Sequence, residues 1–167
     1  MLKSALRLIH TLEDSLLISL LMSMVLLASG QIMLRNFFDM GLVWIDPLLR
    51  VLVLWTGMIG ATVASRDNKH IRIDLLSRLI HKRLHLLLQV VVGLFTSSVC
   101  SIIAWHGARW VQMDYQDQLV AFADLPAWLL ELIIPLAFAL IALRYLFHSL
   151  HWLVMLIRFE DQDLARD

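Results

Sequence analysis

Residues 15–34 read SLLISLLMSMVLLASGQIML, an apolar run without a charged side chain. A membrane helix needs ~20 mostly apolar residues to cross ~30 Å of hydrocarbon, so this run predicts a transmembrane helix. Lys3 and Arg7 precede the run and small residues occupy 28–30, which a signal peptide would also show. The hydrophobic region of a signal peptide covers only ~7–15 residues. We therefore expect a retained membrane span.

Three further apolar stretches follow, at about 47–64, 84–108 and 127–147. The last stays apolar as far as Ile157, which makes ~45 Å of helix at 1.5 Å per residue. Because that exceeds the bilayer, we expect this helix to leave the membrane near residues 144–148 and continue outside it over about 148–160. Hydrophobic residues make up 60% of the chain, against ~45–50% in soluble domains. The sequence predicts an all-α integral membrane protein of four transmembrane helices, with residues 1–167 as a single membrane domain.

Basic residues gather in the two tails and between the second and third spans, at Lys3, Arg7, Arg66, Lys69, Arg72, Arg78, Lys82, Arg83, Arg158 and Arg166. The other two loops carry acidic residues, with Arg35 and Arg109 as their basic ones. Lys and Arg concentrate in cytoplasmic loops of membrane proteins. This distribution predicts that both termini are cytoplasmic.

The basic segment between the second and third spans has its own pattern. Residues 71–83 read IRIDLLSRLIHKR, with leucines and isoleucines on one helical face and polar residues mostly elsewhere. This pattern predicts a short amphipathic helix in the membrane interface, where basic side chains contact anionic lipids. The membrane-surface residues we expect there are Arg72, Arg78, Lys82 and Arg83. The alternative is a simple cytoplasmic extension of the third span.

Patterns that carry enzyme chemistry are missing from the sequence. It has no Gly-rich phosphate loop, no cysteine pair and no Ser-His-Asp arrangement, so we expect no catalytic residues, no metal site and no cofactor. The formal net charge of zero argues against a nucleic-acid partner. The alternative is a membrane anchor subunit of a redox complex that binds haem or quinone through histidines, with His85 on the same side as His148 or His151.

A few charged residues lie within or at the edge of the predicted spans. Asp46 followed by Pro47 suits a helix start, and Arg50 comes one turn later, so Asp46 and Arg50 can pair on one face. The pair is either a capped helix end with a snorkelling arginine or an anchor for a partner protein. Glu131 either snorkels to the interface or makes a buried contact with Arg50 or a partner. We expect Arg144 to snorkel.

Small residues recur four apart in several spans, which lets helix backbones approach closely. These residues are Ser15, Ser19 and Ser23, then Gly57 with Ala61, Gly60 with Ala64, and Gly93, Ser97 and Ser101. Packing among the chain's own helices accounts for most of them. No span carries a polar stripe from one interface to the other. The chain is therefore not expected to move a substrate by itself.

An ordered set of residues resembles the small membrane subunit (DctQ type) of TRAP (tripartite ATP-independent periplasmic) transporters. The set includes Trp44, Asp46, Arg50, Trp55, Gly60, Ala61, Arg66, His70 and Asp74, then Pro126 and Trp128 near the last span. Gly57 and Glu131 join these residues as candidate partner-interface positions. The family usually has a second acidic residue where this chain has Pro47, so a role that needs a carboxylate pair is in doubt.

The resemblance implies a non-catalytic subunit of a bacterial inner-membrane transporter. Its expected partners are a large membrane subunit (DctM type), a periplasmic substrate-binding protein (DctP type) and membrane lipids. In such a system the large subunit moves an organic acid by a sodium-coupled elevator motion. The small subunit packs against the fixed part, and the residues above are its candidate interface and motif positions.

Overall fold

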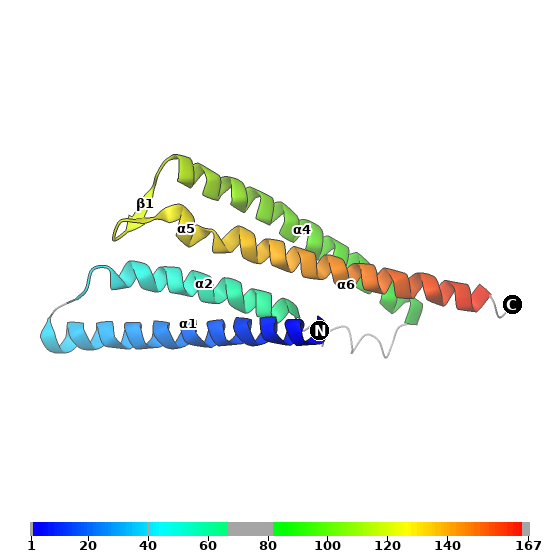
Figure 1. Ribbon diagram of the computed structural model, residues 1–167, viewed down its shortest axis with the longest axis horizontal. Coiled ribbons are helices and arrows are strands. Elements are labelled where there is room, and N and C mark those ends of the chain that lie inside the picture. The colour runs from blue at the N-terminus through cyan, green and yellow to red at the C-terminus, as the bar shows by residue number, and fades with distance from the viewer. Residues whose placement is uncertain (1, 40, 67–81, 165–167) are drawn as a thin grey trace.

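The structure, a computed structural model, describes residues 2–39, 41–66 and 82–164, with only the backbone described at 2–9, 82, 83, 85 and 158–164. Within these residues helices dominate, and one small hairpin interrupts them (Figure 1). The elements are α1 (Leu2–Phe38), α2 (Ile45–Arg66), α4 (Lys82–Gln116), β1 (Val120–Phe122), β2 (Leu125–Pro126), α5 (Ala127–Glu131) and α6 (Ile133–Leu164).

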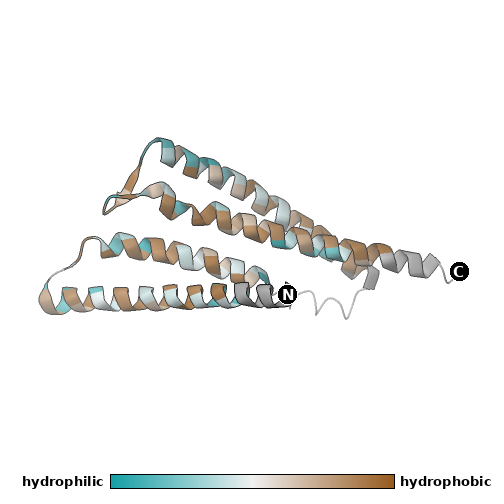
Figure 2. Ribbon diagram, in the orientation of Figure 1, coloured by the Kyte–Doolittle hydropathy of each residue, from teal (hydrophilic) through white to brown (hydrophobic). Residues whose placement is uncertain are grey.

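The predicted fold of four membrane-spanning helices is confirmed. Among the described residues, the stretches long and apolar enough to cross a membrane are His10–Phe38, Ile45–Arg66, Leu86–Gln116 and Ala127–Ile157. Hydrophobic residues, drawn in brown, recur along all four of these helices (Figure 2). The predicted amphipathic helix at 71–83 lies outside the described residues, except that Lys82 and Arg83 begin α4.

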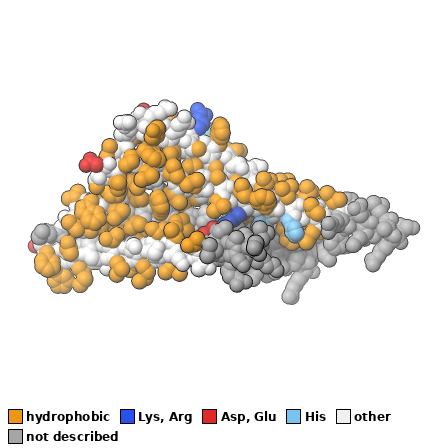
Figure 3. Space-filling view, in the orientation of Figure 1, with side chains coloured by type: hydrophobic (Ala, Val, Ile, Leu, Met, Phe, Trp, Pro, Cys, Tyr) orange, Lys and Arg blue, Asp and Glu red, His pale blue; other side chains and the backbone are white. Residues whose placement is uncertain are grey.

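The spans lie side by side in the order α4, α6, α2, α1 (Figure 1). One end of this row, the hairpin end, holds residues 41–44 before α2 and the β1–β2 hairpin. The other, the termini end, holds the start of α1, the end of α2 and the later part of α6. On the face drawn in Figure 3, hydrophobic side chains cover most of the described surface, as expected where lipid replaces water.

Small residues bring α4 and α6 together. A Cβ added at Gly93 would lie 3.0 Å from Ser149 Cβ, so the helices touch there at backbone distance. The Ser97 hydroxyl donates to the Ala142 carbonyl at 2.9 Å, and the Ser149 hydroxyl donates to the Val90 carbonyl at 3.2 Å. These contacts lie near the termini end, and the ribbons of α4 and α6 separate from there toward the hairpin end (Figure 1), although a Cβ at Gly107 would still lie 3.6 Å from Pro135.

A break separates α5 from α6 at Leu132. Pro135 lacks the N–H that would bond the Glu131 carbonyl, so the helix is interrupted just before it. The Trp55 indole N–H of α2 donates to the Leu130 carbonyl at 2.9 Å. The break therefore supplies an acceptor that ties α2 to the last span.

Two short connections close the hairpin end. The side-chain amide of Gln31, 7% exposed, donates to the Leu42 carbonyl at 3.2 Å and accepts from the Leu42 N–H at 3.4 Å. Between β1 and β2, Ala123 and Asp124 have φ of 49° and 59°. Positive φ at both central residues is the geometry of a two-residue turn that matches the twist of paired strands.

Candidate functional site

A group of charged side chains joins three helices at the termini end. Arg66, the last residue of α2, lies 3.0 Å from Asp14 Oδ1 and 3.8 Å from Glu13 Oε2 on α1. It also donates to the His10 carbonyl at 3.3 Å. The Arg66 and Glu13 side chains are only 17% and 15% exposed. The end of α2 is thus fixed to α1 by charge.

Arg144 of α6 completes this group, which we call the charge cluster: Glu13, Asp14, Arg66 and Arg144. Its guanidinium pairs with Glu13, donates to the Thr62 carbonyl and donates to the Ser65 hydroxyl at 3.3 Å. The prediction that Arg144 snorkels is therefore wrong, because its side chain, 16% exposed, turns toward α1 and α2.

The charge cluster contains two arginines and two carboxylates, so its formal charge is zero. Charges are costly to hold at membrane depth unless they are paired and hydrogen-bonded. Here Glu13 lies between both arginines, and each arginine also donates to a backbone carbonyl. The cluster therefore acts as a clamp between the α1–α2 hairpin and α6.

The charged residues at the start of α2 are arranged differently. Asp46 and Arg50 are both exposed, and their side chains have neither a hydrogen bond nor an ion pair among the described residues. Their predicted pairing is therefore absent. The helix begins at Ile45, which places Asp46 within its first turn rather than at the predicted cap. The Arg50 guanidinium at this end of α2 therefore has no counter-ion among the described residues.

Glu131, at the end of α5, lies beside Asp114 and Trp110 of α4 and not beside Arg50. Asp114 is 8% exposed, and Glu131 Oε2 is buried without a hydrogen-bond partner in the described part of the chain. A hollow of ≈ 500 Å³ adjoins Glu131 between α2 and α4, lined by Leu54, Ile102, Ile103, His106, Gly107, Trp110, Glu131 and Ile134.

The predicted motif positions of α2 divide between two sides of the helix. Trp55 points inward to its bond with α5, and a Cβ at Gly60 would meet Leu17 of α1 at 3.8 Å. Gly57 and Ala61 are exposed, and a Cβ at Gly57 would meet nothing of the described chain within 4 Å. Trp55 and Gly60 therefore serve internal packing, whereas Gly57 and Ala61 are free of it.

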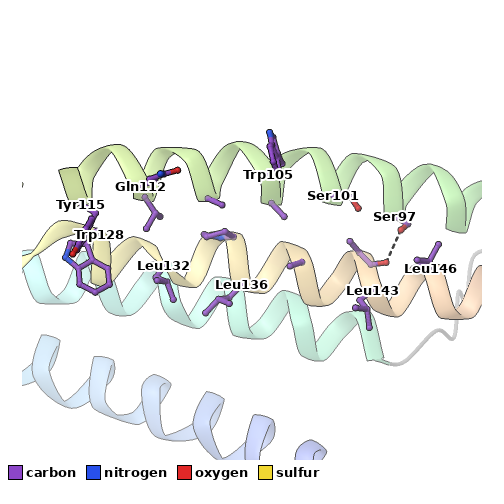
Figure 4. A pocket seen from close by; sticks show the side chains of 16 residues that line it. Ser97, Ser101, Trp105, Gln112, Tyr115, Trp128, Leu132, Leu136, Leu143 and Leu146 are labelled. Carbon is purple, nitrogen blue, oxygen red and sulfur yellow. Dashed lines mark hydrogen bonds between the residues drawn. The ribbon is translucent and has the colours of Figure 1, made fainter. Parts of the chain in front are cut away.

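A second, larger hollow follows α4 and α6, and we call it the α4–α6 groove (Figure 4). Its volume is ≈ 820 Å³, and it extends from Ser97 and Leu146 to Tyr115 and Trp128. The rings of Tyr115 and Trp128 meet edge to face, with centroids 5.5 Å apart. Apart from Ser97, Ser101, Gln112 and Tyr115, its lining is apolar and without charge.

The remaining predicted positions are less informative. Trp44 is exposed in the loop before α2, and Pro126 precedes the first residue of α5. His70, Arg72, Asp74 and Arg78 lie outside the described residues, as do the side chains of Lys82, Arg83 and His85. Among the described side chains, no three His, Cys, Asp or Glu residues are grouped to hold a metal ion.

Sequence reasoning did not single out Glu13, Asp14 or Asp114. For Glu13 and Asp14 a signal did exist. They are the acidic residues directly before the first span, on the side where the other loops are basic. Two carboxylates at the same membrane level as Arg66 and Arg144 could have predicted an ion-pair cluster.

Comparison with known proteins gives one consistent result. The family model for the DctQ component of tripartite ATP-independent periplasmic transporters matches residues 24–155. The chain is 33% identical over 124 residues to a C4-dicarboxylate TRAP transporter small permease protein of Rhodobacter capsulatus, covering 71% of this chain and 53% of that one. It therefore spans about half the length of that relative.

Two further relatives are permease proteins of much greater length. The chain is 30% identical over 98 residues to a sialic acid TRAP transporter permease protein of Haemophilus influenzae, covering 59% of this chain and 16% of that one. It is 22% identical over 105 residues to an isethionate TRAP transporter permease protein of Oleidesulfovibrio alaskensis, covering 62% of this chain and again 16% of the relative.

Proposed function

Because the chain belongs to the DctQ component family of TRAP transporters, we propose that it is a small permease subunit that supports a large membrane subunit without moving substrate itself. The main support for this proposal is that the partly buried charged side chains at the termini end pair with one another. The charged groups of the charge cluster neutralise one another, and both hollows described above are mainly apolar. A substrate anion would find no continuous polar path along these spans.

The proposed complex has three parts. A periplasmic binding protein delivers an organic acid, a large membrane subunit carries it across with a sodium gradient, and this chain remains fixed beside it in the inner membrane. The relatives are named for C4-dicarboxylate, sialic acid and isethionate, all of them acids, which supports an anionic substrate. The basic residues of the two tails and of the segment between the second and third spans support a cytoplasmic location of both termini.

A row of helices joined by a charge cluster suits a fixed support. An elevator-type transporter needs one part to remain still while another slides across the membrane. The cluster links α1, α2 and α6 at one end, and the Trp55 bond links α2 to α5 nearer the other. These two sets of contacts oppose sliding of the helices past one another.

Reconstitution in proteoliposomes tests the proposal. We expect the chain alone to give no uptake of a radiolabelled C4-dicarboxylate, sialic acid or isethionate under an inward sodium gradient. Together with its large subunit and binding protein, it should give uptake of one such acid, and omission of this chain should abolish that uptake. Uptake by the chain alone, or full uptake without it, would overturn the proposal.

A further inference from the structure

The exposed side of α2 forms a continuous face, which we call the α2 face. It consists of Asp46, Arg50, Val53, Gly57, Ala61 and Ala64, all exposed. Their spacing of three or four residues places them in one line along the helix. Small residues in such a line mark places where another helix approaches closely in a membrane. The described chain supplies no such helix, since a Cβ at Gly57 would meet nothing within 4 Å.

Arg50 gives this face a chemical preference. The 22 residues of α2 make ~33 Å of helix, close to the ~30 Å of hydrocarbon, so Arg50 lies about one turn below the membrane boundary. The N-terminus of a helix also carries positive partial charge, which disfavours a cation nearby. No residue of the described chain pairs with Arg50. An anionic group from outside would relieve both costs.

The surface beside the α2 face is concave. Leu54, one turn after Arg50, lines the ≈ 500 Å³ hollow that extends to Gly107, Trp110 and Glu131. Bulky side chains of an incoming helix could enter this hollow while its backbone contacts Gly57. The buried, unbonded Oε2 of Glu131 lies at the same end of the molecule as Arg50 and could accept a hydrogen bond there.

The geometry points to one occupant: a transmembrane helix of the large membrane subunit, with an aspartate or glutamate beside Arg50. This inference rests on the proposed function and specifies the surface through which that function operates. In the two longer relatives the matched region is 16% of the chain, so the rest of each permease is tethered to this domain and held near it. A helix of that remainder is the nearest available partner.

Two other surfaces or occupants fit less well. A second copy of this chain, in the same membrane orientation and related by a two-fold axis, would place one Arg50 at the level of the other, and like charges repel. The α4–α6 groove is larger, but none of its lining residues is charged. Nothing in that groove therefore selects a protein helix over lipid chains.

Photo-crosslinking in the assembled complex tests the surface directly. The residue p-benzoylphenylalanine is placed at Ala61 on the α2 face, or at Leu143 in the α4–α6 groove, and the chain is co-expressed with its large subunit. We expect an adduct with the large subunit from Ala61 and none from Leu143. An adduct from Leu143 alone, or adducts from Ala61 only with lipid or a second copy, would overturn the inference.

A matched pair of glycine variants tests the same surface by recovery. A Cβ meets nothing within 4 Å at either Gly57 or Gly30, so neither position opposes the start of a larger side chain in the isolated chain. We expect Gly57→Leu to lower recovery of the large subunit with the tagged chain by about tenfold, since overfilled contacts are destabilising. Gly30→Leu on α1 should change recovery by less than about twofold.

The possible failures are distinguishable. Equal recovery with Gly57→Leu and Gly30→Leu would overturn the inference and leave the proposed function standing. Failure of the unchanged chain to recover any large subunit would overturn the proposed function, and the inference with it. Charge reversal adds a check: Arg50→Glu should lower recovery, and exchange of the facing carboxylate for arginine in the large subunit should restore it.

Discussion

The two ends of α2 handle their arginines in opposite ways. At the termini end Arg66 is 17% exposed, and its guanidinium bonds to Asp14 and the His10 carbonyl. At the hairpin end Arg50 is exposed and has no partner in the described chain. Arg66 is the last residue of α2, and Arg50 lies near its first turn. The difference shows that Arg66 stabilises the fold of this chain, whereas the side chain of Arg50 remains available to a second protein.

The largest effect should come from breaking the charge cluster. Arg144→Leu removes the cation that pairs with Glu13 and bonds to Thr62 and Ser65, and we expect a loss of about 3 kcal/mol in the free energy of unfolding. Thermal unfolding of the detergent-solubilised chain measures it. The double variant Glu13→Leu with Arg144→Leu should recover part of the loss. If the unchanged chain, the single variant and the double variant were equally stable, the charge cluster would not stabilise the fold, and the two ends of α2 would not differ in this respect.

The close contact of α4 with α6 should rank second. Gly93→Leu would force α4 and α6 apart, because even a Cβ there lies 3.0 Å from Ser149, and we expect a loss of about 2 kcal/mol. The same unfolding measurement applies. Gly30→Leu is the control, since its surroundings are open and leucine favours a helix. A Gly93→Leu protein as stable as the control would contradict the backbone-distance contact.

The indole bond across the helix break should contribute less. Trp55→Phe keeps most of the ring but loses the donor to Leu130, and we expect about 1 kcal/mol of destabilisation. Trp105→Phe is the matched control, because that ring is 68% exposed. If both variants unfold at the same temperature, the bond does not hold α2 against α5.

The smallest effect on the isolated chain should follow from Arg50→Ala. Because Arg50 is exposed and its side chain has no hydrogen bond or ion pair among the described residues, its loss should change the free energy of unfolding by less than about 0.5 kcal/mol. Transport by the assembled system should nevertheless fall, while membrane insertion stays normal. Uptake assays and membrane fractionation measure these separately. Normal transport would count against Arg50 as a partner anchor.

The sequence predicted the fold well because long apolar runs carry the information for membrane spans. It did not predict how charges pair across the fold. Glu13 and Arg144 are 131 positions apart, and that separation hides their proximity. Asp46 and Arg50 have the spacing of a helix pair but do not form one, since an exposed pair at that spacing contributes only ~0.3–0.5 kcal/mol.

The sequence predicted that the small residues are packing positions, but it did not predict which helix each of them contacts. Gly93 and Ser97 contact α6 directly, and Ser97 also lies at one end of the α4–α6 groove, whereas Ser101, next in the same series, is exposed along that groove. A repeat of four residues drifts around a helix of 3.6 residues per turn, so a series leaves one face within a few turns. Which member meets which neighbour depends on crossing geometry that local sequence does not encode.

The charge cluster also sets an order of events during synthesis. At ~5–20 residues per second, Arg66 leaves the ribosome within some seconds of Asp14, whereas Arg144 follows Glu13 by on the order of ten seconds. During that interval Arg66 is the nearest cation of the cluster that can neutralise Glu13 and Asp14 as the first two spans enter the bilayer. The α1–α2 hairpin can thus reside in the membrane before the last helix arrives, and Arg144 then joins a partner already in place.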